Sequence, residues 1–182
     1  MDLSDTEILV RRAQSLAAAR PIDTTIADDA DSERYLVAIC GAERIAIRLT
    51  SVAEVYRPTG VTPLPRPRPP IWGLAAWRGR ILTIAAMGGC APDTGAGMVA
   101  VLTQGREVFA GVWVTDVEGE AAISGTEISA ARGLSGGRQE FLTGMTADAV
   151  LVLDASGLKA LLEREIPASE KGSEQNSTRN AG

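Results

Sequence analysis

The sequence predicts an all-β fold with flanking helices. Apolar residues make up 45% of the chain in many short runs, and 19 glycines are available for the turns between them. Such a pattern is typical of short strands joined by tight turns. A proline-rich stretch, 58–70, lies in the middle of the chain. Proline fixes φ and lacks an N–H, so this stretch is expected to be an ordered, extended crossing. The 182 residues leave room for one domain or for two small lobes that share a core.

Residues 1–33 are expected to form an amphipathic helix followed by an acidic linker. Ser4 and Glu7 have the spacing of a capping box, and the helix should end before Pro21. The region contains eight acidic and three basic residues, which account for the whole net charge of −5. Residues 21–33 have few large apolar side chains, and we interpret them as a linker.

The first two strands are predicted at 34–40 and 44–49, with a turn at 41–43 between them. Apolar and basic residues alternate along the second strand: Ile45, Ile47 and Leu49 against Arg44 and Arg48. Because side chains alternate between the two faces of a strand, this pattern indicates a half-buried hairpin.

The segment 52–84 is the centre of the predicted domain. It opens with Val-Ala-Glu-Val, in which Glu54 is the single carboxylate between two valines. After the proline-rich crossing, 71–77 is interpreted as a buried strand and 81–84 as its returning partner. Arg78-Gly79-Arg80 forms the turn. An apolar hairpin with arginine at its tip is suited to present a surface to a partner.

Five further strands are expected in the second half of the domain: 98–103, 107–117, 120–123, 141–146 and 149–153. The glycine-rich stretch 88–97 is interpreted as a loop, and 124–140 as a long mobile connection. Asp154 should begin a helix that runs to Glu165. The polar residues 166–182 lack the apolar side chains needed to fold and are predicted to be a disordered tail.

The composition argues against an enzyme. The chain has no histidine, which removes histidine acid–base chemistry, catalytic triads and histidine metal ligands. Cys40 and Cys90 are too few for a structural zinc site, and we expect them to stay reduced. The loop 88–97 has no lysine and leads into no helix, so it is not a phosphate-binding loop. We therefore expect no catalysis, no cofactor and no metal.

Charge and hydropathy indicate a cytoplasmic protein that binds other proteins. No apolar run approaches the ~20 residues of a membrane span, and the N-terminal region has no secretory signal pattern. We expect no membrane insertion. Five arginines fall in a window without any acidic residue: Arg57, Arg66, Arg68, Arg78 and Arg80. Because the chain is acidic overall and has no recognition helix, these arginines favour an acidic protein partner over nucleic acid.

The central motifs resemble those of the CheW-like domain. They are the V-x-E-V step, the P-L-P crossing, the I-x-G-L run and the R-G turn before an apolar strand. The stretches 108–117 and 142–154 resemble the family's later strands. The similarity covers about 34–165 in the family's order, which separates this domain from the regions 1–33 and 166–182. The family contains adaptors of bacterial chemosensory arrays.

The resemblance implies two small five-stranded, SH3-like barrels with a hydrophobic seam between them. It implies a non-catalytic chemotaxis adaptor, or scaffold, which couples a chemoreceptor signalling tip to the regulatory domain of a CheA-type histidine kinase. Carried onto this sequence, the residues expected to bind partner proteins are Val52, Glu54, Trp77, Arg78 and Gly79.

Three positions depart from the family's pattern. Ala85-Ala86-Met87 stands where an aspartate-leucine pair is usual, Thr115 replaces a common aspartate, and Ala76-Trp77 replaces Asn-Leu before the turn. The Trp-Arg-Gly form resembles divergent adaptors of pilus-linked chemosensory systems. The missing aspartates leave an alternative open, a stand-alone protein-binding or structural β-barrel that no longer pairs with a kinase.

Overall fold

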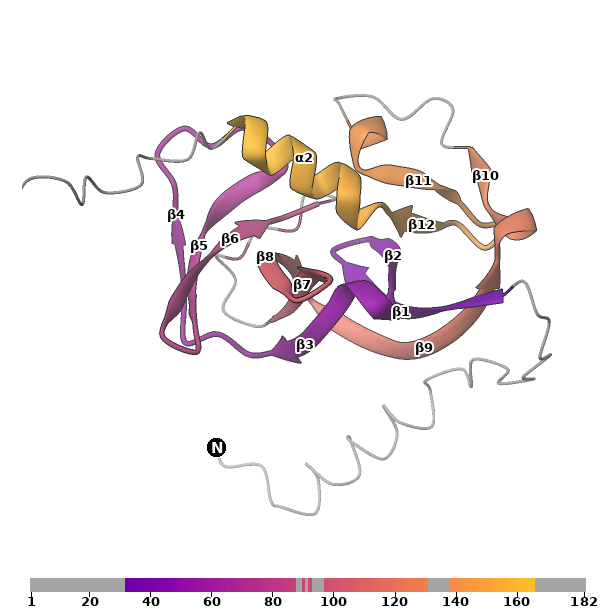
Figure 1. Cartoon of the computed structure of the whole chain (residues 1–182), viewed down its shortest axis with the longest axis horizontal. Coiled ribbons are helices and arrows are strands. Elements are labelled where there is room, and N and C mark those ends of the chain that lie inside the picture. The colour runs from indigo at the N-terminus through magenta and orange to yellow at the C-terminus, as the bar shows by residue number, and fades with distance from the viewer. Residues whose placement is uncertain (1–31, 88–89, 91, 93–96, 131–137, 166–182) are drawn as a thin grey trace, which may run out of the picture.

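Two six-stranded sheets make up the computed structural model, which describes residues 32–87, 90, 92, 97–130 and 138–165 (Figure 1). The first sheet has the order β10-β11-β12-β2-β1-β9, and the second has the order β3-β7-β8-β6-β5-β4. The mostly-β fold class is confirmed. Each sheet contains six strands, whereas five per barrel were predicted.

The elements have the following bounds. The first sheet consists of β1 (Ser32–Cys40), β2 (Glu43–Arg48), β9 (Asp116–Ser124), β10 (Ser129–Ala130), β11 (Leu142–Met145) and β12 (Val150–Leu153). The second consists of β3 (Val52–Tyr56), β4 (Val61–Pro63), β5 (Ile71–Trp77), β6 (Arg80–Ala85), β7 (Met98–Gln104) and β8 (Glu107–Val114). The helical elements are η1 (Leu49–Ser51), η3 (Gly125–Glu127), η4 (Arg138–Glu140) and α2 (Ala155–Glu165).

Strands of the first sheet contribute to two separate cores, one on each face. We call the part of the domain built on each sheet a lobe. In β12, Val150 and Val152 belong to a small cluster inside the first lobe, whereas Leu151 and Leu153 belong to the large cluster shared with the second sheet. The two-residue period of a strand produces this division. Ala46 in β2 follows the same rule and is fully buried in the small cluster. The predicted half-buried pattern of β2 was therefore wrong at its centre, because both faces are covered there.

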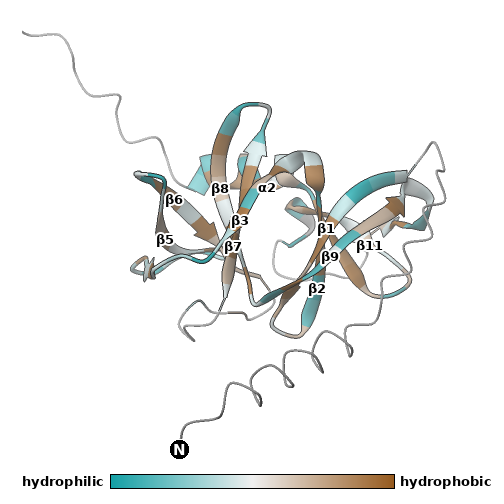
Figure 2. Ribbon diagram, turned by 90° about the horizontal axis from the view of Figure 1, so that it is seen from below, coloured by the Kyte–Doolittle hydropathy of each residue, from teal (hydrophilic) through white to brown (hydrophobic). Residues whose placement is uncertain are grey.

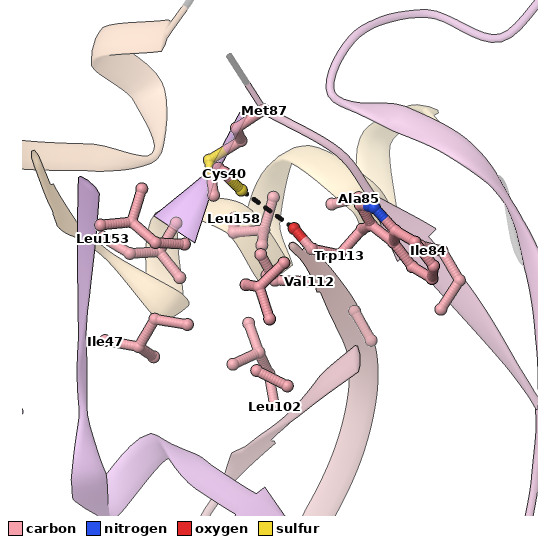
Figure 3. Close-up of a cluster of buried hydrophobic side chains, with 14 of the residues drawn as sticks. Cys40, Ile47, Ile84, Ala85, Met87, Leu102, Val112, Trp113, Leu153 and Leu158 are labelled. Atoms are coloured by element: carbon pink, nitrogen blue, oxygen red, sulfur yellow. Dashed lines mark hydrogen bonds between the residues drawn. The ribbon is translucent and has the colours of Figure 1, made fainter. Parts of the chain in front are cut away.

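The helix α2 lies over the region where the two lobes meet (Figure 1). Asp154 begins it as predicted, since its carboxylate accepts a hydrogen bond of 2.9 Å from the Ser156 N–H. The helix buries Leu158, Leu161 and Leu162 in the large cluster. The close-up shows Leu158 among side chains from both sheets (Figure 3). In Figure 2, strands of both lobes carry brown, apolar stretches. Buried side chains from both sheets belong to one large cluster, which forms the seam between the lobes.

The predicted strand 107–117 is divided at Thr115. β8 ends at Val114 in the second sheet, and β9 begins at Asp116 in the first. Thr115 fixes this switch because its backbone N–H and its Oγ1 both donate to the carbonyl oxygen of Ile39, at 2.7 and 3.0 Å. Valines on both sides hid the crossover, since Val114 is buried before it and Val117 is half-buried after it.

Two predicted connections contain regular structure. The crossing 58–70 includes the short edge strand β4, which ends at Pro63, where no ladder donor is required. Opposite it, a Cβ on Gly73 would collide with the Thr62 carbonyl oxygen, so this glycine permits β4 to pair closely. The connection 124–140 includes η3, β10 and η4. The predicted N-terminal helix and most of the linker (1–31), residues 131–137 and the tail (166–182) lie outside the described residues.

Candidate protein-binding site at the β5–β6 hairpin

The tip of the β5–β6 hairpin is a two-residue turn formed by Arg78 and Gly79. Trp77 pairs with Arg80 across the turn, and φ is +45° at Arg78 and +74° at Gly79. Two positive φ values define a type I′ turn, whose twist matches that of the flanking strands. Glycine adopts this conformation freely, whereas a residue with a Cβ at a positive φ is strained by about 1–2 kcal/mol. The sequence therefore keeps arginine at a position that asparagine or glycine would fill with less strain.

Glu54 of β3 holds the hairpin tip by two hydrogen bonds. The indole Nε1–H of Trp77 donates to one carboxylate oxygen, and the guanidinium of Arg78 donates to the other. The Arg78 guanidinium also lies over the Trp77 ring, with its central carbon 5.4 Å from the ring centroid. Next to this group, the Tyr56 hydroxyl donates to the Ala76 carbonyl oxygen at 3.0 Å.

These contacts close the second lobe into a barrel. β3 lies at one edge of the sheet, and β5 is next to the other edge, so no backbone ladder joins them. The side chains of Glu54 and Tyr56 span the opening instead. We call Glu54, Trp77 and Arg78 the tip cluster.

The tip cluster keeps Glu54 ionised. Donation from Trp77, and then from Arg78, lowers the pKa of the Glu54 carboxyl below its ordinary value. A lowered pKa in the folded state means that the stabilisation is present above the ordinary pKa. It is lost as the pH falls through the lowered value.

We predict that the Trp77 indole N–H reports this titration. In an NMR titration to acid, its resonance should shift with an apparent pKa below the ordinary glutamate value, and the shift should disappear in Glu54→Gln. Trp72 and Trp113 serve as internal controls, because the described structure gives neither indole a bond to Glu54. A Trp77 midpoint at or above the ordinary glutamate pKa would contradict the bonding described.

Three of the five residues predicted to bind partners lie together in the tip cluster. Gly79 adjoins it in the turn, with open space where a Cβ would point. Val52 lies at the start of β3, is half-buried, and packs against the large core. The structure therefore places four of the predicted residues at the tip. Val52 lies apart from them, at the start of the strand that contains Glu54.

Sequence reasoning missed Ile81, the residue after the turn. Its exposed fraction is 74%, although it belongs to an apolar run that was interpreted as strand. The strand assignment was right, but the end of the hairpin extends beyond the core. The available signal was the position of Ile81 one residue after Arg80, at the turn end of the predicted hairpin.

The two cysteines are free and buried. The Cys40 thiol donates to the Trp113 carbonyl oxygen at 2.9 Å (Figure 3). Burial, and then the neighbouring Cys90, raise the pKa of Cys40 to about 12, so the thiol is protonated at neutral pH. Cys40 consequently has no nucleophilic thiolate to offer.

Two of the departures from the expected pattern have structural roles. Ala85 is fully buried in the large core, and Thr115 anchors the switch between the sheets. Within the ranges that the structure describes, no group of three or more His, Cys, Asp or Glu residues is arranged to hold a metal ion. A search of the same ranges finds no helix with the length and apolarity of a membrane span.

Comparison with known proteins identifies one family. The model of the CheW-like domain matches residues 34–162. Among solved structures, the scaffolding protein TtCheW from Thermoanaerobacter tengcongensis has a similar fold, with a TM-score of 0.51 and 17% sequence identity. The match covers 67% of this chain and 88% of that one. The curated proteins gave no match.

Proposed function

The chain belongs to the CheW-like domain family, and we propose that it is a non-catalytic chemosensory adaptor that couples a chemoreceptor to a CheA-type histidine kinase. In this proposal the binding unit is 34–165. Its partners are the signalling tip of the receptor and the regulatory domain of the kinase. The proposal places the protein in the cytoplasm and requires no cofactor.

The tip cluster is the observation that carries the proposal. Arg78 exposes 69% of its side chain, yet the Glu54 carboxylate and the Trp77 ring hold its guanidinium in one orientation. A cation that is ordered before binding loses little further side-chain entropy when a partner docks. The planar guanidinium can pair with carboxylates or carbonyl oxygens of that partner. The strained φ of Arg78 supports a role in binding, because the turn itself does not require arginine.

The structural roles of Ala85 and Thr115 support a second candidate. At these positions the resemblance leads us to expect aspartates, and here the side chains stabilise the fold. A barrel that has lost contacts made by those aspartates fits the alternative of a stand-alone protein-binding module. The two candidates differ in whether a kinase regulatory domain binds.

We predict that the full chain binds both partners. The experiment is isothermal titration calorimetry with the CheA-type regulatory domain, and then with the receptor signalling-tip fragment, both from the organism that encodes this chain. Saturable 1:1 binding to each, with all three components co-eluting in gel filtration, is the expected result. Binding to neither protein would reject the adaptor function and favour the stand-alone module.

A further inference from the structure

A pocket of about 610 Å³ lies between the proline-rich crossing and the C-terminal end of α2. Leu64 and the neighbouring prolines of the crossing form apolar walls, and the charged lining consists of Arg66, Arg68, Arg164 and Glu165. The volume falls within the range of about 300–1,000 Å³ that is usual for ligand sites. We call this site the arginine pocket. It lies apart from the tip cluster, since none of the tip residues lines it.

The arginine pocket has positive charge that the fold does not use. Arg66 has no hydrogen-bond or ion-pair partner in the described part of the chain. Arg68 exposes 79% of its side chain and makes one ion pair, at 3.1 Å, with Glu165. Arg164 pairs at 2.5 Å with Glu140, which does not line the pocket, and lies 3.9 Å from Glu165. Exposed pairs of this kind are weak, so other carboxylates can compete for the guanidinium donors.

The sum of charges in the pocket favours an anionic occupant. Three arginines against one glutamate leave a net positive charge in the lining. The C-terminal end of a helix adds only a partial negative charge, which these arginines outweigh. The apolar walls favour an occupant that carries aliphatic side chains beside its carboxylates.

The backbone of Arg66 supports a binding role. Its φ of +54° lies in the left-handed region, where a residue with a Cβ is strained. Prolines on both sides of it fix their own φ and limit how the turn can relax. Strain of this kind persists mainly at ligand sites and switches. A strained arginine without a polar partner in the described fold therefore indicates a partner from outside it.

An acidic segment that matches the pocket is present in this chain. Residues 21–31, which lie outside the described residues, contain four aspartates and no basic residue. Two isoleucines lie among the aspartates and suit the apolar walls. The tail 166–182 continues from Glu165 beside the pocket, but its two acidic residues are balanced by two basic ones. Charge complementarity therefore favours 21–31 over the tail.

The segment of the same molecule is badly placed to reach the pocket. The start of β1, which follows it, and the C-terminal end of α2 lie on opposite sides of the molecule along its longest axis (Figures 1 and 2). Residues 21–31 span at most about 40 Å when fully extended. A domain of this size has a radius of gyration of about 14 Å, so a path around its surface to the other side is longer, roughly 55 Å. A second copy has no such limit.

We propose that residues 21–31 of one copy dock in the arginine pocket of a second copy. Aspartates of the segment pair with Arg66 and Arg68, and an isoleucine packs against the apolar walls. Because the two contacting surfaces differ, the contact is head-to-tail and can continue from copy to copy. The inference goes beyond the adaptor function and does not depend on it, since the purified chain supplies both surfaces.

Zero-length cross-linking of the full chain tests the docking. Arg68→Lys keeps the positive charge and puts a primary amine in the pocket, which a carbodiimide joins to a neighbouring carboxylate. Unlabelled and isotope-labelled chains are mixed in equal amounts, so mass spectrometry distinguishes links between copies from links within one. The expected product joins position 68 to an aspartate of 21–31 in another copy. A link from position 68 to Glu165 is the internal control for reactivity. Arg106→Lys, in the exposed turn between β7 and β8, should give no link to 21–31.

Three outcomes of the cross-linking would overturn the inference. The first is a link to Glu165 without any link to 21–31. The second is a link to 21–31 only within one copy. The third is a link to Glu170 or Glu174, which would make the tail the occupant.

Sedimentation velocity provides an independent measurement. The wild-type chain should self-associate as its concentration rises, and salt should weaken the association because it screens exposed charges. Arg66→Glu should weaken it at least about tenfold through like-charge repulsion, whereas Arg106→Glu should not. Both residues at position 66 carry a Cβ, so the backbone strain is similar and the melting temperature should stay within about 2 °C of wild type. Mixing Arg66→Glu with a chain carrying Asp28→Arg and Asp29→Arg should restore association. A monomeric wild type, or equal association of wild type and Arg66→Glu, would contradict the proposal.

Discussion

Replacing Arg78 with alanine is expected to weaken binding to the receptor tip or the kinase regulatory domain at least about 30-fold, as truncation of an interface hot spot does. The guanidinium is exposed, pre-ordered by Glu54, and stacked on Trp77, so it is available to a partner in one geometry. Alanine removes the donors while keeping the Cβ. The backbone strain at φ +45° is therefore similar in both proteins, and the comparison isolates the side chain.

The same substitution should leave the melting temperature within about 2 °C of wild type. An exposed ion pair contributes little to folding because water and salt screen it. Arg106→Ala provides the matched control, since Gly105 and Arg106 form the two-residue turn of the β7–β8 hairpin. Calorimetry and thermal melts of the three proteins give the answer. Unchanged affinity for Arg78→Ala would show that the tip cluster is solvated surface, and a large fall in melting temperature would show that the arginine supports the fold.

Charge reversal at Glu54 is a less specific test than Arg78→Ala. Glu54→Arg would place two guanidinium groups side by side and would leave the Trp77 indole N–H without its acceptor. A loss of binding in that variant would combine a changed surface with a disturbed barrel closure. Glu54→Gln keeps the side-chain shape and is the better companion variant.

Local pattern was enough to predict most strands. The β5–β6 hairpin was predictable because an apolar run, an Arg-Gly turn and a second apolar run follow each other without interruption. The crossover at Thr115 was not, because valines lie on both sides of it and only a contact with Ile39 reveals the switch. Ala46 was misjudged for a related reason. Ala46 shares one face of its strand with Arg44 and Arg48. Such a residue looks solvent-facing unless a second core is known to cover that face.

The candidate site was predicted as a set of residues but not as a structure. Glu54 and Trp77 are 23 residues apart, and their strands are not neighbours in the sheet. No strand periodicity encodes their contact, which depends on the curvature that closes the lobe. Ile81 was missed because hydropathy alone does not show that the end of a hairpin extends past the core.

Leu158→Ala is expected to destabilise the whole domain by about 2–5 kcal/mol, the usual range for removing a fully buried leucine. Leu158 has no exposed surface and lies in the cluster that contains Ile47 and Leu153 of the first sheet and Leu102 and Val112 of the second (Figure 3). The cavity left by alanine would therefore remove contacts from both lobes at once. Glu163→Ala, on the exposed side of the same helix, is the control and should change stability by less than about 0.5 kcal/mol.

Two probes report the unfolding of the two lobes separately in this experiment. All three tryptophans lie in the second sheet, at Trp72, Trp77 and Trp113, so their fluorescence during urea unfolding reports that lobe. Amide hydrogen exchange along β1 and β2 reports the first lobe. If α2 joins the lobes into one cooperative unit, Leu158→Ala shifts both probes by the same free energy. A shift in one probe alone would show that the lobes unfold independently and that the seam is a contact between two separate cores.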